Sequence, residues 1–179
     1  AYVGNARSYT GNSLLVGSGT FDLIGGLQST LMGKQLWLVG GAADDAVFQT
    51  NGSYSPALGT GVLWNPTNSG GFSARVAGLT VNLGGAAAPM TFGVTSNFLS
   101  SGATLNFGSI TSDAVVLFAN GLNFNGATQT IKVVANNTAG TNDWTVLGGA
   151  LQNGSLTKTG DGLLVLEANN NTGGTPLVN

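Results

Sequence analysis

The chain has 179 residues, of which 42% are hydrophobic and only 7% charged, and its formal net charge is −2. The absence of His and Cys excludes a disulfide framework, a thiol nucleophile and a thiolate zinc site. A near-neutral charge supplies no basic surface, so we expect neither nucleic acid binding nor membrane insertion. We expect residues 1–179 to fold as a single domain without a cofactor.

Short apolar runs interrupt a composition in which Gly, Asn, Ser and Thr make up nearly half of the residues. Each run is bounded by Gly, Asn or Ser and has the length of a β-strand. No stretch has the period of a helix, so we expect an all-β fold with little or no helix. In chain order the candidate strands are Leu14–Val16, Thr20–Ile24, Gln35–Val39, Ala46–Gln49, Val62–Trp64, Leu79–Leu83, Met90–Val94, Ala103–Phe107, Val115–Ala119, Leu122–Phe124, Thr130–Ala135, Trp144–Leu147, Ser155–Thr159 and Leu163–Glu167.

Two β architectures have short strands at this spacing: a sandwich of antiparallel hairpins and a β-solenoid of stacked parallel rungs. Asn-Gly and Asp-Gly pairs favour hairpins, but solenoid corners use the same left-handed conformations. Low charge and many Asn and Thr favour the solenoid, because stacked rungs align like residues and like charges would repel. We expect rungs of about 20 residues. The pairs are Asn51-Gly52, Asn120-Gly121, Asn125-Gly126, Asn153-Gly154 and Asp161-Gly162.

The carboxyl-terminal segment, residues 153–179, contains Leu156-Thr157-Lys158-Thr159-Gly160 and, further on, Ala168-Asn169 and Thr172-Gly173-Gly174-Thr175. With this spacing it resembles the autotransporter-associated β-strand repeat. Segments 70–74, 79–85 and 128–131 resemble, more loosely, the sequence that precedes such repeats. The resemblance implies a right-handed parallel β-helix that is secreted or displayed on a bacterial cell surface, usually within a much longer chain. It implies no particular enzyme.

The amino-terminal segment, residues 5–24, resembles the same repeat entered part-way through. If Thr172-Gly173 is aligned with Thr10-Gly11, Leu177-Val178 falls over Leu15-Val16. The end of one solenoid could therefore continue into the start of the next, between copies or within a longer repetitive chain. In the alternative interpretation such repeats occur anywhere in these proteins, and the likeness of the two ends has no meaning. The candidate assembly residues are Tyr9, Thr10, Leu15, Thr172, Leu177 and Val178.

Catalysis without His would depend on carboxylates, and their spacing selects no set that could act together. For calcium, residues 42–46 and 140–144 offer one or two oxygens each where six to eight are needed, so we expect solvated loops. We therefore expect no enzyme, no metal and no cofactor. The acidic residues are Asp22, Asp44, Asp45, Asp113, Asp143, Asp161 and Glu167, and the basic ones are Arg7, Lys34, Arg75, Lys132 and Lys158.

Two functions remain. The first is an extracellular structural protein, as a fibre subunit, surface-layer element or passenger stalk, whose partner is itself or neighbouring repeats. The alternative is an adhesin module that binds surface glycans through exposed aromatic side chains. For Trp37 and Trp144, which lie in apolar runs, core or subunit-contact positions are favoured. The aromatic candidates are Tyr2, Tyr9, Trp37, Tyr54, Trp64 and Trp144.

Overall fold

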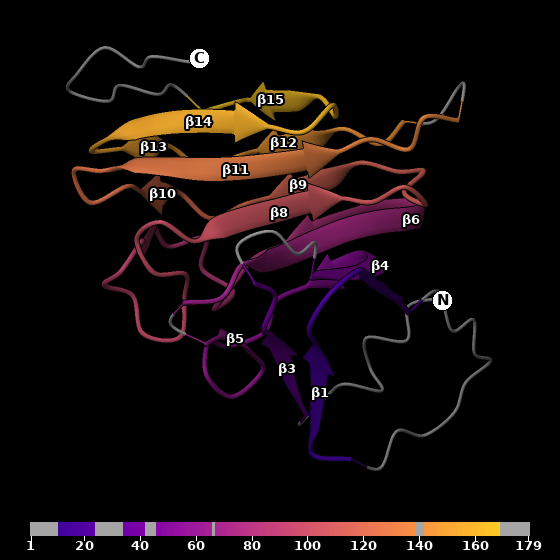
Figure 1. The fold of residues 1–179 in the computed structure, drawn as a ribbon, viewed down its shortest axis with the longest axis horizontal. Helices are drawn as coiled ribbons and strands as arrows, with labels where there is room; N and C mark the ends of the chain where they lie inside the picture. The colour runs from indigo at the N-terminus through magenta and orange to yellow at the C-terminus, as the bar shows by residue number, and fades with distance from the viewer. Residues whose placement is uncertain (1–10, 24–33, 42–45, 66, 139–141, 169–179) are drawn as a thin grey trace.

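The computed structural model describes residues 11–23, 34–41, 46–65, 67–138 and 142–168 (Figure 1). Within these residues the protein is all-β and has no helix. The strands are β1 (Ser13–Val16), β2 (Thr20–Asp22), β3 (Gln35–Leu38), β4 (Val47–Tyr54), β5 (Val62–Trp64), β6 (Gly70–Val81), β7 (Met90–Thr91), β8 (Thr104–Gly108), β9 (Val116–Phe118), β10 (Leu122–Asn123), β11 (Thr128–Val134), β12 (Thr145–Leu147), β13 (Leu151–Gln152), β14 (Ser155–Thr159) and β15 (Leu164–Leu166).

The strands form three sheets in which every strand-to-strand pairing is parallel. Two sheets have three strands, in the orders β1-β3-β5 and β13-β10-β7, and the third has nine. In the nine-stranded sheet β14, β11 and β8 lead to one half of β6, and β9, β12 and β15 continue from the other half. Strand β4 pairs with both halves of β6, and β2 pairs with β4.

The strands recur in a fixed order along the chain. A strand from one of the small sheets is followed by strands of the large sheet, as in β7-β8-β9, β10-β11-β12 and β13-β14-β15. Each strand then pairs with its counterpart in the next group, so β8, β11 and β14 lie one above the other in Figure 1. Thr145 pairs with Leu164, 19 residues later, and Leu79 pairs with Val116, 37 residues later. The expected spacing of about 20 residues matches only the shortest connections.

The core is built from aligned aromatic side chains. Phe21, Phe48, Phe72 and Phe107 occupy equivalent positions on paired strands, and the last three are fully buried. Phe21 and Phe48 stack with ring centroids 6.3 Å apart. Successive side chains of a strand point to opposite faces of the sheet. The residues next to these phenylalanines in the sequence therefore lie on the outer face of the sheet, away from the core.

Each candidate strand overlaps an observed one, but the sequence analysis does not predict one strand and parts of two others. Strand β13 is not predicted, β4 runs on to Tyr54, and β6 begins at Gly70, nine residues before the expected start at Leu79. Glycine is normally read as a strand breaker. At Gly71 it is required, because a Cβ there would overlap the backbone carbonyl oxygen of Asn106 on β8. The close approach of two strands therefore explains the missed start of β6.

The Asn-Gly pairs do not mark antiparallel hairpins in the described residues. Asn125 and Gly126 have φ angles of 55° and 75°, and the Ala127 amide donates to the Phe124 carbonyl oxygen at 3.1 Å. This tight turn connects β10 to β11, which pair with other strands and not with each other. The left-handed conformations serve as corners between sheets, which was one of the two interpretations of this signal.

Candidate functional site

Of the six candidate assembly residues, Leu15 is within the described residues, and Tyr9, Thr10, Thr172, Leu177 and Val178 lie outside them. Leu15 is on β1, at the edge of the β1-β3-β5 sheet, and its side chain is 60% exposed. In the same row, Trp37 on β3 is half-buried and Leu63 on β5 is only 8% exposed. This row lies on the face of the sheet opposite to the core, and a further strand beside β1 would add a neighbour next to Leu15.

The other end of the described stack is also apolar. Leu166 on β15 pairs with Leu147 on β12, which is buried in the core. Leu166 occupies the equivalent position but remains 38% exposed, and Leu164 is only partly buried against the core. The last described strands therefore leave core-type side chains incompletely covered, as β1 does at the opposite end.

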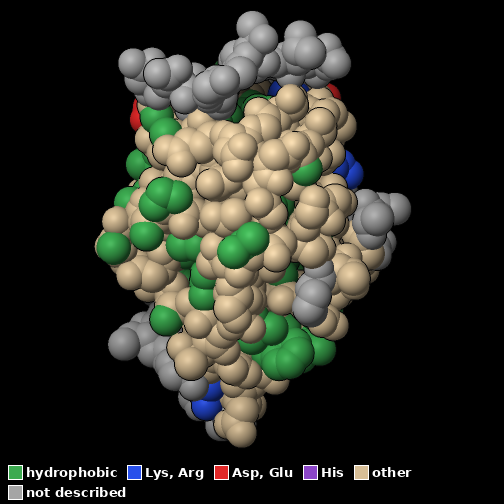
Figure 2. All heavy atoms as spheres, turned by 90° about the vertical axis from the view of Figure 1, so that its left-hand side faces the viewer, with side chains coloured by type: hydrophobic (Ala, Val, Ile, Leu, Met, Phe, Trp, Pro, Cys, Tyr) green, Lys and Arg blue, Asp and Glu red, His purple; other side chains and the backbone are tan. Residues whose placement is uncertain are grey.

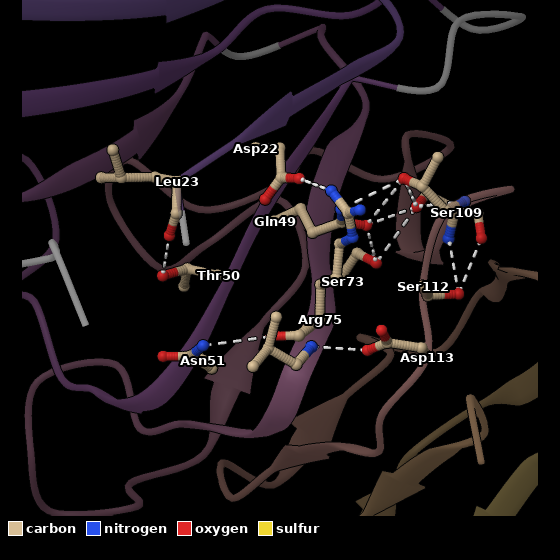
Figure 3. Close-up of polar contacts among 12 residues, drawn as sticks. Asp22, Leu23, Gln49, Thr50, Asn51, Ser73, Arg75, Ser109, Ser112 and Asp113 are labelled. Atoms are coloured by element: carbon tan, nitrogen blue, oxygen red, sulfur yellow. Dashed lines mark hydrogen bonds and ion pairs between the residues drawn. The ribbon is translucent and has the colours of Figure 1, made fainter. Parts of the chain in front are cut away.

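A cluster of polar side chains lies on the outer face of the large sheet (Figure 3), and we call Gln49, Ser73, Ser109 and Thr111 the amide cluster. The Gln49 Oε1 atom accepts hydrogen bonds from the hydroxyls of Ser73 at 2.9 Å, Ser109 at 2.5 Å and Thr111 at 3.3 Å. The Gln49 Nε2 atom donates to Thr111 Oγ1 at 3.1 Å. Gln49, Ser73 and Ser109 are buried. No sequence pattern singles out this cluster, because its members come from two strands and the loop after β8.

An ion pair lies beside the amide cluster. The Arg75 guanidinium donates to the Asp22 carboxylate at 2.5 Å, with the side chains 33% and 3% exposed. The second Asp22 oxygen, Oδ1, is buried without a hydrogen-bond partner. Nearby, Asp113 accepts a hydrogen bond from the Val76 amide at 2.5 Å, and Val76 has a φ of 72°, a conformation that β-branched residues rarely adopt. These carboxylates hold the backbone and a neighbouring strand in place.

A pocket of about 300 Å³ opens next to the cluster. The hydroxyls of Ser109 and Thr111 on its wall are already bonded to Gln49, so they are not free to orient a ligand. Within the described residues no group of three or more acidic side chains could hold a metal ion, and Asp44 and Asp45 lie outside them. The lining residues are Gly19, Thr20, Asp22, Gly108, Ser109, Ile110, Thr111 and Val134.

The aromatic candidates do not form an exposed row. Trp64 and Tyr54 are both in the core, so the idea that they stack on sugar rings is wrong. The Trp64 Nε1 atom donates to the Gly70 carbonyl oxygen at 3.2 Å, and burial raises the pKa of the Tyr54 phenol. Trp37 and Trp144 are half-buried, and the Trp37 indole N–H donates to Gln35 Oε1 at 3.2 Å. Tyr2 and Tyr9 lie outside the described residues.

Comparison with known proteins does not extend the sequence resemblance. No family model matches the chain, and no curated protein and no solved structure matches it. In the part of the chain that the structure describes, no helix has the length and apolar character needed to cross a membrane. The structure therefore shows an all-β fold with parallel sheets.

Proposed function

We propose that this chain is an extracellular structural protein, a right-handed parallel β-solenoid that serves as a subunit or segment of a fibre, surface layer or passenger stalk. In this proposal it stacks head-to-tail, either with a second copy or with neighbouring repeats of one longer chain. The observation that carries the proposal is the exposed Leu15 on an edge strand, at the end of a row of apolar side chains that continues into half-buried Trp37 and buried Leu63.

Parallel pairing between successive strand groups supports the solenoid. In such a stack the first and last rungs expose unpaired backbone donors and acceptors, and a further rung of the same kind can satisfy them. Apolar side chains that are incompletely covered occur at both ends of the described stack, at Leu15 and Leu166. Joining these ends would bury apolar surface and extend the sheets at the same time. The contact is heterologous, so it continues into a filament unless a rotation closes it into a ring.

The surface chemistry fits a structural role. Figure 2 shows a face made mostly of uncharged polar atoms, with scattered hydrophobic side chains and few charged ones. Stacked rungs bring equivalent surface positions to within about 5 Å of one another, so a charged residue would repel its copies in a regular stack. The hydroxyls of the amide cluster and the amide of Gln49 are paired with each other and hold the fold together.

A glycan-binding adhesin module is the second candidate, and a different pocket favours it. A pocket of about 310 Å³ is formed by Trp64, residues 93–98 and Ser100, and carries the polar side chains of Thr95, Ser96 and Asn97. A small uncharged hollow of this kind could accommodate one sugar unit. Saturable binding to a glycan array that disappears in an Asn97→Ala variant would favour this function over the structural one.

The structural function is tested with residues 1–179 alone, by sedimentation velocity and electron microscopy over a range of concentrations. We expect concentration-dependent polymers whose length falls sharply in a Leu15→Asp variant. Val94→Asp is the matched control, because Val94 is 66% exposed but lies in the loop after β7, and not on β1 or β15 at the two ends of the described stack. Monomers at all concentrations, or equal loss of polymer in both variants, would contradict the proposal.

A further inference from the structure

A regular array of hydroxyl side chains lies on three adjacent strands of the large sheet. Thr104 on β8, Thr130 on β11 and Thr157 on β14 are paired in register and form one row across the strands. Thr128 and Ser155 form a second, parallel row two residues away. We call the following set the hydroxyl face: Thr104, Thr128, Thr130, Ser155, Thr157 and Thr159.

These side chains face away from the core. In β11 the burial alternates, with Gln129, Ile131 and Val133 buried and Thr128 and Thr130 on the opposite side. Thr128 is exposed and Thr130 half-buried, as expected for short side chains flanked by neighbours on a flat sheet. Figure 1 shows β8, β11 and β14 as three stacked ribbons at the front of the molecule.

The hydroxyl groups of this face are not engaged by the protein. Among the described residues none of the six has a hydrogen-bond partner for its side chain, whereas all three hydroxyls of the amide cluster are bonded to Gln49. Each hydroxyl therefore has one donor and two acceptor positions available to an outside ligand. Because the backbone beneath is hydrogen-bonded in register, the array is rigid and loses little entropy when it binds.

The spacing of the array is that of single water molecules in a solid lattice. Neighbouring strands are about 4.8 Å apart, and alternate residues along a strand are about 6.7 Å apart. Water molecules joined tetrahedrally by hydrogen bonds of about 2.75 Å have second-neighbour oxygens about 4.5 Å apart and a layer repeat of about 7.3 Å. The two grids agree to about one part in ten in both directions.

We propose that the hydroxyl face binds the surface of ice, with threonine hydroxyls and methyl groups holding a patch of ordered water in register with the lattice. The repeating unit of the array is one hydroxyl per roughly 32 Å², which is too small a cell for a sugar ring. The array also lacks the aromatic side chains on which sugar rings stack. The face is uncharged apart from Lys132, which lies between Asn106 and Thr159 in the row beyond Thr130.

The test measures the freezing behaviour of the 179-residue chain by osmometry, as thermal hysteresis and as the shape of ice crystals. We expect hysteresis with faceted crystals for the unaltered chain, and its loss in a Thr130→Lys variant, because a long charged side chain at the centre of the array separates it from the lattice. Thr128→Lys is a second variant at an exposed position, where we expect little effect on folding. Circular dichroism and thermal melting verify that both variants remain folded.

Ser53→Lys is the matched control. Ser53 is an exposed hydroxyl on β4, but its row continues into Thr80 and then Leu117, so it belongs to no hydroxyl array. This variant should keep the full hysteresis. The proposal is overturned if the unaltered chain shows no hysteresis, if Thr130→Lys and Thr128→Lys retain it, or if Ser53→Lys loses it equally. Binding to crystalline cellulose or chitin without hysteresis would also overturn it and would assign the face to a polysaccharide.

Discussion

Hydroxyl side chains occupy the outer face of the nine-stranded sheet in two places. The two regions differ in whether these hydroxyls are hydrogen-bonded to other side chains. In the amide cluster the hydroxyls are bonded to Gln49 and largely buried. On the hydroxyl face, across β8, β11 and β14, the same groups are exposed or half-buried and have no partner in the described protein. Residue type is the same in both regions, so composition alone does not decide which one stabilises the fold.

The connections between strands explain the difference. After β8, residues 109–115 fold back over the sheet, so that Thr111 reaches Gln49 on β4, 62 positions away in the chain. After β14, only residues 160–163 precede β15. That connection is too short to return across the sheet and cover the hydroxyls. Where a loop folds back over the sheet, as after β8, the polar groups beneath it are bonded and buried, and the four predictions below test this comparison.

The largest effect is expected for Gln49→Ala. This variant removes the acceptor of three hydroxyls and leaves buried Ser73 and Ser109 only the longer hydrogen bonds between themselves and to Thr111. Unsatisfied buried polar groups and the resulting cavity should lower the free energy of unfolding by about 2–4 kcal/mol. Chemical denaturation followed by circular dichroism measures it. A loss below about 0.5 kcal/mol would mean that the amide cluster does not stabilise the fold.

A smaller loss is expected for Arg75→Met, which leaves the buried Asp22 carboxylate without its cation. Removing one partner of a fully buried pair costs about 3–5 kcal/mol, and the partial exposure of Arg75 reduces this to about 1–3 kcal/mol. Denaturant unfolding is the measurement, with Arg75→Lys as the control that keeps the charge. If the Met variant is as stable as the Lys variant, the ion pair contributes nothing to the fold.

The sequence predicts the strands of both regions better than their polar contacts. Alternation in Leu122–Phe124 and the apolar runs around it locate strands because burial of one face repeats along the chain at short range. The register that aligns Thr104, Thr130 and Thr157 depends on pairing over 26 and 27 residues, and no local rule contains it. Strand identity was therefore predictable, and the array of hydroxyls was not.

For the candidate site, too, the sequence predicts strand positions better than it predicts which side chains are buried. Leu15 was expected at an edge because of its likeness to the carboxyl-terminal segment, and it does lie on an edge strand with an exposed side chain. Its assembly role is untested and remains a prediction. Trp64 and Tyr54 were candidates for an exposed aromatic row and are buried, because apolar side chains on successive strand groups meet in one core that local sequence does not reveal. Gln49 had no sequence signal at all.

A pH-dependent effect is expected for Asp161, in the short connection after β14. The Ala135 amide donates to its carboxylate at 3.1 Å, and this hydrogen bond, aided by its own backbone amide, Asn137 and Lys158, lowers the pKa of Asp161 below its ordinary value of 3.8. Because the folded-state pKa is depressed, the stabilisation is present above the unfolded-state pKa and is lost as the pH falls through the folded-state value.

Asp161→Asn should therefore lower the melting temperature slightly at pH 7, and the difference from the unaltered chain should vanish in acid, once the pH is below the folded-state pKa of Asp161. The side chain is fully exposed, so salt should weaken the Lys158 contribution. Melting curves by differential scanning calorimetry at several pH values measure it. A difference that grows as the pH falls would contradict the assigned sign.

The smallest effect on folding is expected for the double variant Thr130→Val and Thr157→Val. Both residues lie on the hydroxyl face, and neither hydroxyl is bonded within the described protein, so its removal leaves no buried partner unsatisfied. Valine keeps the shape and the preference of threonine for β-strands. The free energy of unfolding should change by no more than about 0.5 kcal/mol in denaturant titrations, against about 2–4 kcal/mol for Gln49→Ala. A loss close to that of the Gln49 variant would show that the hydroxyl face serves folding. A change near zero would mean that these hydroxyls are dispensable for the fold, so that a ligand at the surface, and not stability, is what the array can serve.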